Sequence, residues 1–237
     1  YLTLKDCIEE NGGTVVEPND KANENADENA DENQVEEIKT TIYYVTDEIQ
    51  QSQYINMFRS HGQDAVILNH NIDSPFITQL EQRNPNIRFQ RIDADVTDIA
   101  KEEITEEDKE AFKETSDSLI EIFRNALGND KLDVKIEKLK DENVASMITL
   151  SEQNRRMQEM MKMYGMDGMD MGGDSTLVLN ANHPLVQYVV SHKEDEKVSL
   201  ICKQLYDLAM LGNQPLGPDA MTEFVKRSNE IMMMLTK

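Results

Sequence analysis

The apolar pattern is clearest at the end of the chain, where residues 198–235 predict two amphipathic helices joined by a turn. Side chains that are mostly apolar recur there at spacings of three and four, which places them on one face of a helix. In the first helix these positions are Val198, Ile201, Cys202, Leu205, Tyr206, Ala209 and Met210, and in the second they are Met221, Phe224, Val225, Ser228, Ile231, Met232 and Leu235. The turn, residues 212–219, contains two glycines and two prolines, and Pro218 with Asp219 is typical of a helix start.

Two antiparallel helices do not cover apolar faces this wide by themselves. One solution is a second copy of the pair, which gives a two-fold four-helix bundle between two chains. The other is that the pair packs on the core of its own domain, as amphipathic helices commonly do. The residues expected at an interface between copies are Val198, Ile201, Leu205, Leu208, Met221, Phe224, Val225, Ile231, Met232 and Leu235.

Residues 41–98 alternate between strand and helix patterns. Strands are predicted at 42–46, 65–68 and 87–92, and short helices at 52–61 and 74–83. This β-α-β-α-β order predicts a small doubly wound α/β layer. Asp47 and Glu48 follow the first strand without a glycine, so a phosphate-binding turn is not expected there.

An acidic linker without periodicity, residues 93–103, separates this layer from a second domain at 104–237. The second domain is expected to begin with a helix that ends at Gly128, followed by strands at 132–136, 144–150 and 175–179. The first two of these strands are expected to pair across a polar turn. The predicted fold class is α+β overall: a small doubly wound α/β sub-domain, then an α+β domain with a three-stranded sheet and the helix pair.

Methionine is concentrated in one segment, because half of the 14 methionines lie in residues 157–171. Three interpretations are open: an ordinary core helix, a Cu(I) site built from thioethers, or an adaptable apolar surface that binds partners. The glycine-rich sequence after Gly165 favours the surface. Its candidate contact residues are Met157, Met160, Met161, Tyr164, Met166 and Met169.

The charge balance narrows the classes of partner. With 24 basic and 46 acidic residues, the net charge of −22 argues against binding to nucleic acid or to an anionic membrane. Part of the excess lies in residues 17–37, where a tetrapeptide repeat at 22–33 predicts a solvated insertion. No apolar run is long enough to span a bilayer, and the two cysteines suit a reducing compartment, so a soluble cytoplasmic protein is expected. The first residue is Tyr1 rather than methionine, so the chain is expected to be a piece of a longer protein.

Catalytic chemistry is not indicated. The four histidines, His61, His70, His183 and His192, lack metal-ligand spacing, and no activated nucleophile is visible. His183 precedes Pro184, which suggests a structural role at the start of a helix over 185–190, with Asn182 as its cap.

A family resemblance emerges from several segments in order. Residues 176–186, Thr-Leu-Val-Leu-Asn-Ala-Asn-His-Pro-Leu-Val, resemble the L-x-x-N-x-x-H-P signature of the ninety-kilodalton heat-shock protein chaperones in their bacterial HtpG form. Residues 42–46, Ile-Tyr-Tyr-Val-Thr, resemble the I-Y-Y-x-T that opens the last sub-domain of that family's middle region. Residues 135–139 lie where the family has the first strand of its carboxy-terminal domain, and the final helix pair lies where the family dimerises.

The resemblance implies a domain plan. Residues 1–40 would lead from a middle domain that is absent here and would carry the acidic insertion at 17–37. Residues 41–98 would be the small α/β sub-domain of the middle domain. Residues 104–237 would be the carboxy-terminal dimerisation and client-contact domain.

The resemblance also implies a function, that of a stress-response chaperone that assists protein folding. The partners would be a second copy of the chain and partly unfolded clients, which the methionine segment would contact, with no nucleic acid and no membrane. ATP and Mg²⁺ would bind in an absent amino-terminal domain, so this chain is expected to hold no cofactor or metal and to be no enzyme. Two alternatives stay open: a small α/β enzyme or ligand-binding domain with a dimerising tail and a ligand near Asp47, Asn69 and His70, and a copper-binding methionine-rich module.

Overall fold

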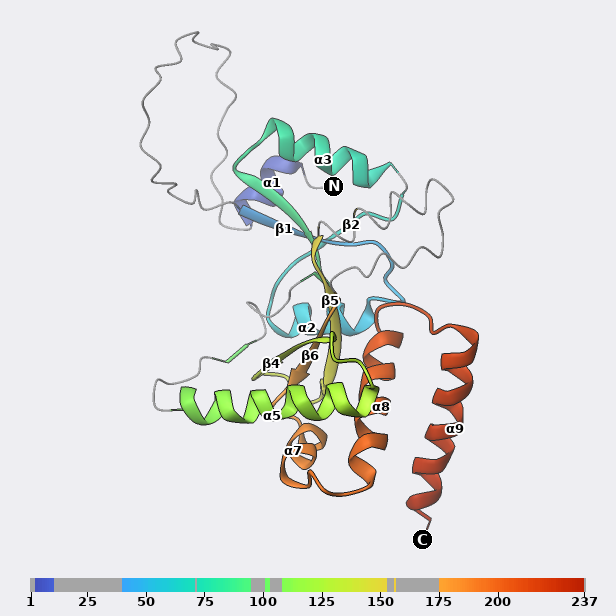
Figure 1. The fold of residues 1–237 in the computed structure, drawn as a ribbon. Coiled ribbons are helices and arrows are strands. Elements are labelled where there is room, and N and C mark those ends of the chain that lie inside the picture. Colours follow the sequence, from blue (N-terminus) through green and yellow to red (C-terminus); the bar gives the residue numbers. More distant parts are fainter. Residues whose placement is uncertain are drawn as a thin grey trace. The chain divides into compact units, whose positions relative to one another are not determined.

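The chain divides into two compact units. The structure is a computed structural model that describes residues 3–10, 40–70, 72–94, 101–102, 108–152, 156 and 175–236 (Figure 1). Unit one comprises Tyr1–Thr46 and Ala65–Arg91, and unit two comprises Asp47–Asp64 and Ile92–Lys237.

Unit one contains a small parallel sheet. Its elements are α1 (Leu4–Glu10), β1 (Thr40–Val45), β2 (Val66–Ile67), α3 (Asp73–Arg83) and β3 (Ile87–Arg91). Among the described residues the strand order is β2-β1-β3 and both pairings are parallel, with Tyr44 opposite Val66 and Ile42 opposite Phe89. The predicted parallel strands are therefore confirmed.

Alternate residues of these strands build the core of unit one. Ile42 and Tyr44 in β1 are buried, as are Ile87 and Phe89 in β3, because side chains two apart lie on the same face of a strand. The same core contains Ile8 from α1 and Ile77 from α3. The apolar pattern of the sequence thus accounts for this core, although Ile67 of β2 and Phe76 of α3 are exposed.

Unit two is a mixed sheet surrounded by helices. Its elements are α2 (Ser52–Ser60), α5 (Lys109–Leu127), β4 (Asp133–Glu137), β5 (Ser146–Leu150), β6 (Ser175–Asn180), α7 (Pro184–Ser191), α8 (Lys197–Leu211) and α9 (Pro218–Met234). Helix α5 ends as predicted at Gly128, which has a positive φ of 63° that glycine adopts without strain.

The strand order of unit two corrects the prediction of a β4–β5 hairpin. The observed order is β4-β6-β5, so β6 lies between the two strands, parallel to β4 and antiparallel to β5. Leu177, Val178 and Leu179 of β6 are all buried, but so are all five residues of β5, so burial alone does not identify the central strand. In β4, by contrast, Val134 and Ile136 are buried while Asp133 and Lys135 are exposed, the pattern predicted for a strand with one face in water.

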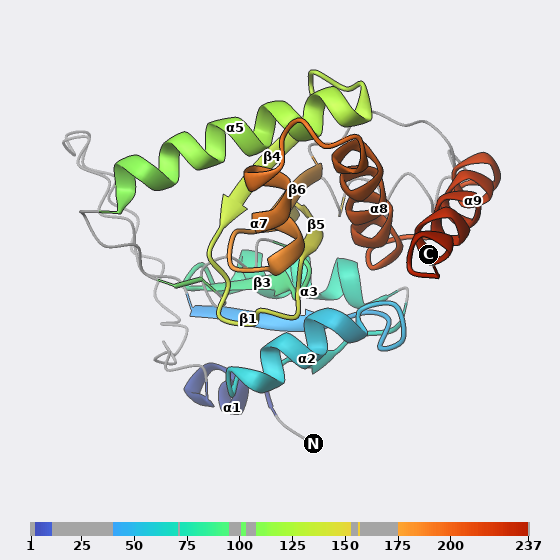
Figure 2. The same cartoon turned by 90° about the horizontal axis from the view of Figure 1, so that it is seen from below.

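The core of unit two lies between the sheet and three helices. Figure 2 shows α5, α7 and α8 arranged around the strands, with α9 on the outer side of α8. This core contains Leu119 and Phe123 from α5, Val186 and Val189 from α7, and four residues of α8 that are described below.

Helix α2 differs from its predicted place. The sequence assigns it to the α/β layer, whereas its contacts group it with unit two. There the buried Tyr54 hydroxyl donates a hydrogen bond of 2.7 Å to the carbonyl of Ile148 in β5. An apolar face identifies a helix but not the sheet it covers.

Asn180, at the end of β6, organises the neighbouring turns. Its side chain is fully buried, and its Oδ1 accepts from the amides of Leu139 and Asn182, both at 3.0 Å. Its Nδ2 donates to the carbonyls of Asp141 at 3.0 Å and Val144 at 2.8 Å. One amide thus fixes the connection between β4 and β5 to the end of the central strand.

Candidate functional site

Helix α8 buries one face in the core of its own chain. Val198, Cys202, Leu205 and Ala209 recur at spacings of four, three and four and belong to the core of unit two. Val198 is 5% exposed and Leu205 2% exposed within the single chain. Both pack against the sheet and helices of their own chain, which leaves them little surface to offer to a second copy.

The side of α8 next to this buried face is more open. Leu208 is 48% exposed, and Ile201 is half-buried. Leu208 lies one turn beyond Gln204, whose side chain contacts α9. Leu208 therefore has exposed apolar surface, whereas Ile201 packs partly against the core of unit two.

Helix α9 contains no buried residue among its 17. Four predicted interface residues, Met221, Val225, Met232 and Leu235, are exposed. The other two, Phe224 and Ile231, are half-buried.

Met233 and Met234, which sequence reasoning missed, are exposed as well. Their signal was the run of three methionines at 232–234, which breaks the helical period and so fell outside a one-face pattern. The apolar surface at the end of α9 is therefore larger than predicted.

The turn between the helices forms as expected. Gly217 precedes the helix with extended backbone, Pro218 occupies its first turn and Asp219 follows, where a carboxylate favours the positive end of the helix dipole. On the α8 side, the side-chain amide of Gln50 donates a hydrogen bond to the carbonyl of Asn213. Residues just before α2 thus hold the turn in place.

Polar side chains join α8 and α9 in a group that sequence reasoning also missed. Arg227 pairs with Asp207, and its Nε donates to Gln204 Oε1 at 2.9 Å. Gln204 Nε2 in turn donates to Ser228 Oγ at 3.1 Å. Ser228 is the one polar residue in the predicted apolar stripe of this helix. This break in the stripe was the signal that could have indicated a polar contact.

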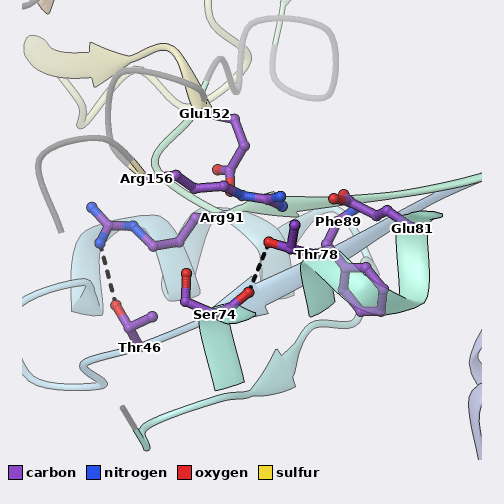
Figure 3. Close-up of polar contacts among 8 residues, drawn as sticks. All are labelled: Thr46, Ser74, Thr78, Glu81, Phe89, Arg91, Glu152 and Arg156. Atoms are coloured by element: carbon purple, nitrogen blue, oxygen red, sulfur yellow. Dashed lines mark hydrogen bonds and ion pairs between the residues drawn. The ribbon is translucent and has the colours of Figure 1, made fainter. Parts of the chain in front are cut away.

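The methionine segment lies outside the described residues, so Met157, Met160, Met161, Tyr164, Met166 and Met169 stay predictions. The described chain approaches it at Glu152, which is buried and forms an ion pair of 2.8 Å with Arg156; both side chains are drawn in Figure 3.

The segment with the L-x-x-N-x-x-H-P pattern has a structural role. His183, rather than the predicted Asn182, caps α7, because its Nδ1 accepts from the amide of Leu185 at 3.1 Å. Burial lowers the pKa of His183, which favours the neutral imidazole that this acceptor role requires. Asn182 instead donates to Glu102 and to the carbonyl of Leu139, both at 3.1 Å.

The open alternative of a ligand near Asp47 gains no support from the geometry. Asp47 Oδ1 accepts from the amides of Ile49 at 2.9 Å and Gln50 at 3.0 Å, so this carboxylate caps a turn. Within the described stretches, no group of three or more histidine, cysteine, aspartate or glutamate side chains is placed to hold a metal ion.

Polar groups of unit one also serve the fold. Arg91 donates to the Thr46 hydroxyl at 3.3 Å, and the Thr78 hydroxyl donates to the carbonyl of Ser74 at 2.9 Å (Figure 3). The amide of Phe89 donates to the Glu81 carboxylate at 2.7 Å.

A small apolar cavity of about 140 Å³ lies between α5 and α7, lined by residues that include Leu119 and Val186. Ligand pockets are commonly about 300–1,000 Å³, so this cavity is too small for a nucleotide.

Cys202 is a core thiol. It is fully buried, and burial raises its pKa to about 12. A thiol held neutral in this way is a poor nucleophile, so its role is in packing.

No helix within the described ranges combines the length and apolar composition needed to cross a membrane.

Comparison with known proteins gives one family. The family model described as Hsp90 protein matches residues 19–236. The chain is 33% identical over 173 residues to the Chaperone protein htpG of Bacteroides fragilis (strain 638R), which covers 69% of this chain and 25% of that protein. It is 30% identical over 166 residues to the Chaperone protein HtpG of Porphyromonas gingivalis (strain ATCC 33277), covering 66% of this chain and 24% of that one.

A longer match extends the same relationship. The Chaperone protein HtpG of Psychrobacter cryohalolentis is 24% identical over 211 residues, covering 84% of this chain and 31% of its own length. The chain therefore spans about a quarter of the length of the first curated relatives that it matches.

Proposed function

The chain belongs to the Hsp90 protein family, and from this premise we propose that it forms the dimerisation and client-contact portion of an ATP-dependent chaperone that assists protein folding in the cytoplasm. Its relatives are named chaperone proteins. ATP binding and hydrolysis would belong to the remainder of the full-length protein, and this portion would be no enzyme by itself.

The observation that carries the proposal is the exposed face of α9. Met221, Val225 and Met232 lie four and seven positions apart, so they share one face of the helix, and all three are exposed in the single chain. An amphipathic helix with no buried residue and an open apolar stripe is short of a partner. A second copy of the hairpin formed by α8 and α9 supplies the matching stripe by two-fold symmetry.

The proposed interface is narrower than the sequence indicated. It comprises α9 residues and, from α8, Leu208 and Ile201, whereas Val198 and Leu205 support it from inside the subunit. Each copy thus contributes one helix that faces outward and one helix that is anchored in a core. Such an arrangement keeps the subunits folded when they separate.

Client contact is proposed for the methionine segment, from Met157 to Met169. Unbranched and polarizable methionine side chains fit many apolar sequences, which suits a chaperone that binds diverse partly unfolded chains. Dimerisation would hold two such segments near one another, which increases the avidity for an extended client.

Sedimentation of the chain and of two variants with the same change in charge tests dimerisation. Val225 is 50% exposed on the apolar stripe, and Lys226 is 75% exposed on the polar side. Val225→Asp and Lys226→Gln each lower the net charge by one. We expect a dimer for the parent chain and for Lys226→Gln, and a folded monomer for Val225→Asp. A parent chain that stays monomeric up to about 0.1 mM would sink the proposal.

Suppression of client aggregation tests the methionine segment. Replacing Met157, Met160 and Met161 with serine should weaken suppression while the sedimentation of the dimer is unchanged. Replacing Met232 with serine, as the control, should weaken the dimer instead. Unchanged suppression by the triple variant would place client contact elsewhere.

A further inference from the structure

The contact between α8 and α9 has an ionic centre. The Arg227 side chain is 11% exposed and that of Asp207 15% exposed, so their ion pair is largely shielded from water. Arg227 Nε also bonds Gln204, and Gln204 bonds Ser228. We call these four residues, Gln204, Asp207, Arg227 and Ser228, the α8–α9 clamp.

Apolar residues flank the clamp on α9. Phe224 lies three positions before Arg227, and Ile231 lies three positions after Ser228, so all four share one face of the helix. Phe224 and Ile231 are half-buried. Apolar contact is non-directional and permits rotation or sliding, whereas the planar guanidinium fork binds in one orientation.

The turn leaves α9 dependent on this clamp. The carbonyl of Asn213, just after α8, accepts a hydrogen bond from Gln50, which fixes the start of the turn. The turn is therefore the pivot about which α9 would rotate relative to α8. Beyond the pivot α9 has no buried residue to hold it. The clamp is the directional contact that resists a swing of α9 about the turn.

We propose that Arg227 is a positioning residue that fixes α9 against α8 and so presents the exposed stripe in the geometry that a second copy accepts. This inference rests on the proposed dimer. Arg227 need not touch the partner, because it acts by removing alternative orientations of α9 before association. Preorganisation of this kind strengthens binding without adding contacts.

Symmetry doubles the effect. A two-fold interface contains two copies of α9, and each must be held by its own clamp. Loss of the clamp is therefore expected to weaken the dimer at least about tenfold in Kd, with no apolar interface residue changed.

The test compares neighbouring cations with different surroundings. Arg227→Met removes the bonds of the clamp to Asp207 and Gln204 and leaves the bond from Gln204 to Ser228, and Lys226→Met removes an exposed charge from the adjacent position. Arg227→Lys keeps a cation near Asp207 but lacks Nε, so it should rescue in part. Two quantities are measured: amide hydrogen exchange of α9 in dilute monomer, and the dimer Kd by sedimentation.

We expect Arg227→Met to speed exchange in α9 alone and to raise Kd, Arg227→Lys to be intermediate, and Lys226→Met to match the parent. The unfolding midpoint of unit two should not change, because α9 adds no residue to its core. Equal exchange and Kd in Arg227→Met and Lys226→Met would overturn the inference, as would a general loss of stability. A monomeric parent would refute the proposed dimer. The exchange rates of α9 would still show whether Arg227 fixes this helix against α8.

Discussion

Replacing Asn180 with alanine gives the most quantitative test of how the signature segment works. The change removes four hydrogen bonds made by one fully buried side chain. The bonds to the Leu139 amide and the Val144 carbonyl are themselves buried, so both groups lose their partner away from water. Each such loss costs about 1–3 kcal/mol.

The other two bonds, to Asp141 and Asn182, are only partly buried, and water can replace the amide there. The expected loss in the free energy of unfolding of unit two is therefore about 2–6 kcal/mol. Domains are stable by about 5–15 kcal/mol in total, so the loss takes a large share of the stability.

The assay is equilibrium unfolding in urea, followed by circular dichroism, for Asn180→Ala and for Asn182→Ala as control. The Asn182 side chain bonds Glu102 at an exposed site and the Leu139 carbonyl at a partly buried one, so its loss should cost less than about 1 kcal/mol. Similar small losses in both variants would refute the view that Asn180 organises these turns.

Further predictions concern burial inside unit two. Leu205→Asp should prevent folding, because it puts a carboxylate into the core. Leu208→Asp should leave the unfolding midpoint unchanged and disrupt only the proposed dimer; circular dichroism with sedimentation separates the two outcomes. Burial raises the pKa of Cys202 to about 12 in the folded chain, so unfolding releases a proton above about pH 9. The free energy of unfolding should therefore fall as the pH rises from there, and urea titrations with and without Cys202→Ala measure this fall. Tyr54→Phe should cost about 1–3 kcal/mol in thermal unfolding, since the carbonyl of Ile148 loses a buried donor, and no change would argue against the docking of α2 on β5.

Local patterns predicted local structure well. Alternation in β4, the continuous apolar run of β6 and the glycine at the end of α5 each depend on neighbours in sequence, and each was found as expected. The pairing of β4 with β5 was wrong because adjacency along the chain favours a hairpin, whereas β6 lies between these two strands in the sheet. Both β5 and β6 contain three apolar residues, so composition does not show which of them is central.

The candidate site shows where periodicity stops being informative. Leu205 and Leu208 lie three positions apart on α8 and were both predicted at the interface, yet one is buried in the core of its own chain and the other is half exposed. A helical period identifies apolar faces without saying which core each one joins. Arg227 was missed for a related reason: its partners lie 20 and 23 positions earlier, beyond the reach of any i,i+4 rule.

The position of β6 has a consequence for the order in which the protein folds. The strand at the centre of the sheet is the last of the three in sequence, and Thr176 pairs with Asp133, 43 positions earlier. During synthesis β4 and β5 therefore emerge with apolar residues such as Ile136 and Ile148 uncovered until β6 arrives. Pairing over such a separation is slow. A nascent chain of this kind needs protection from aggregation for as long as translation of those residues takes.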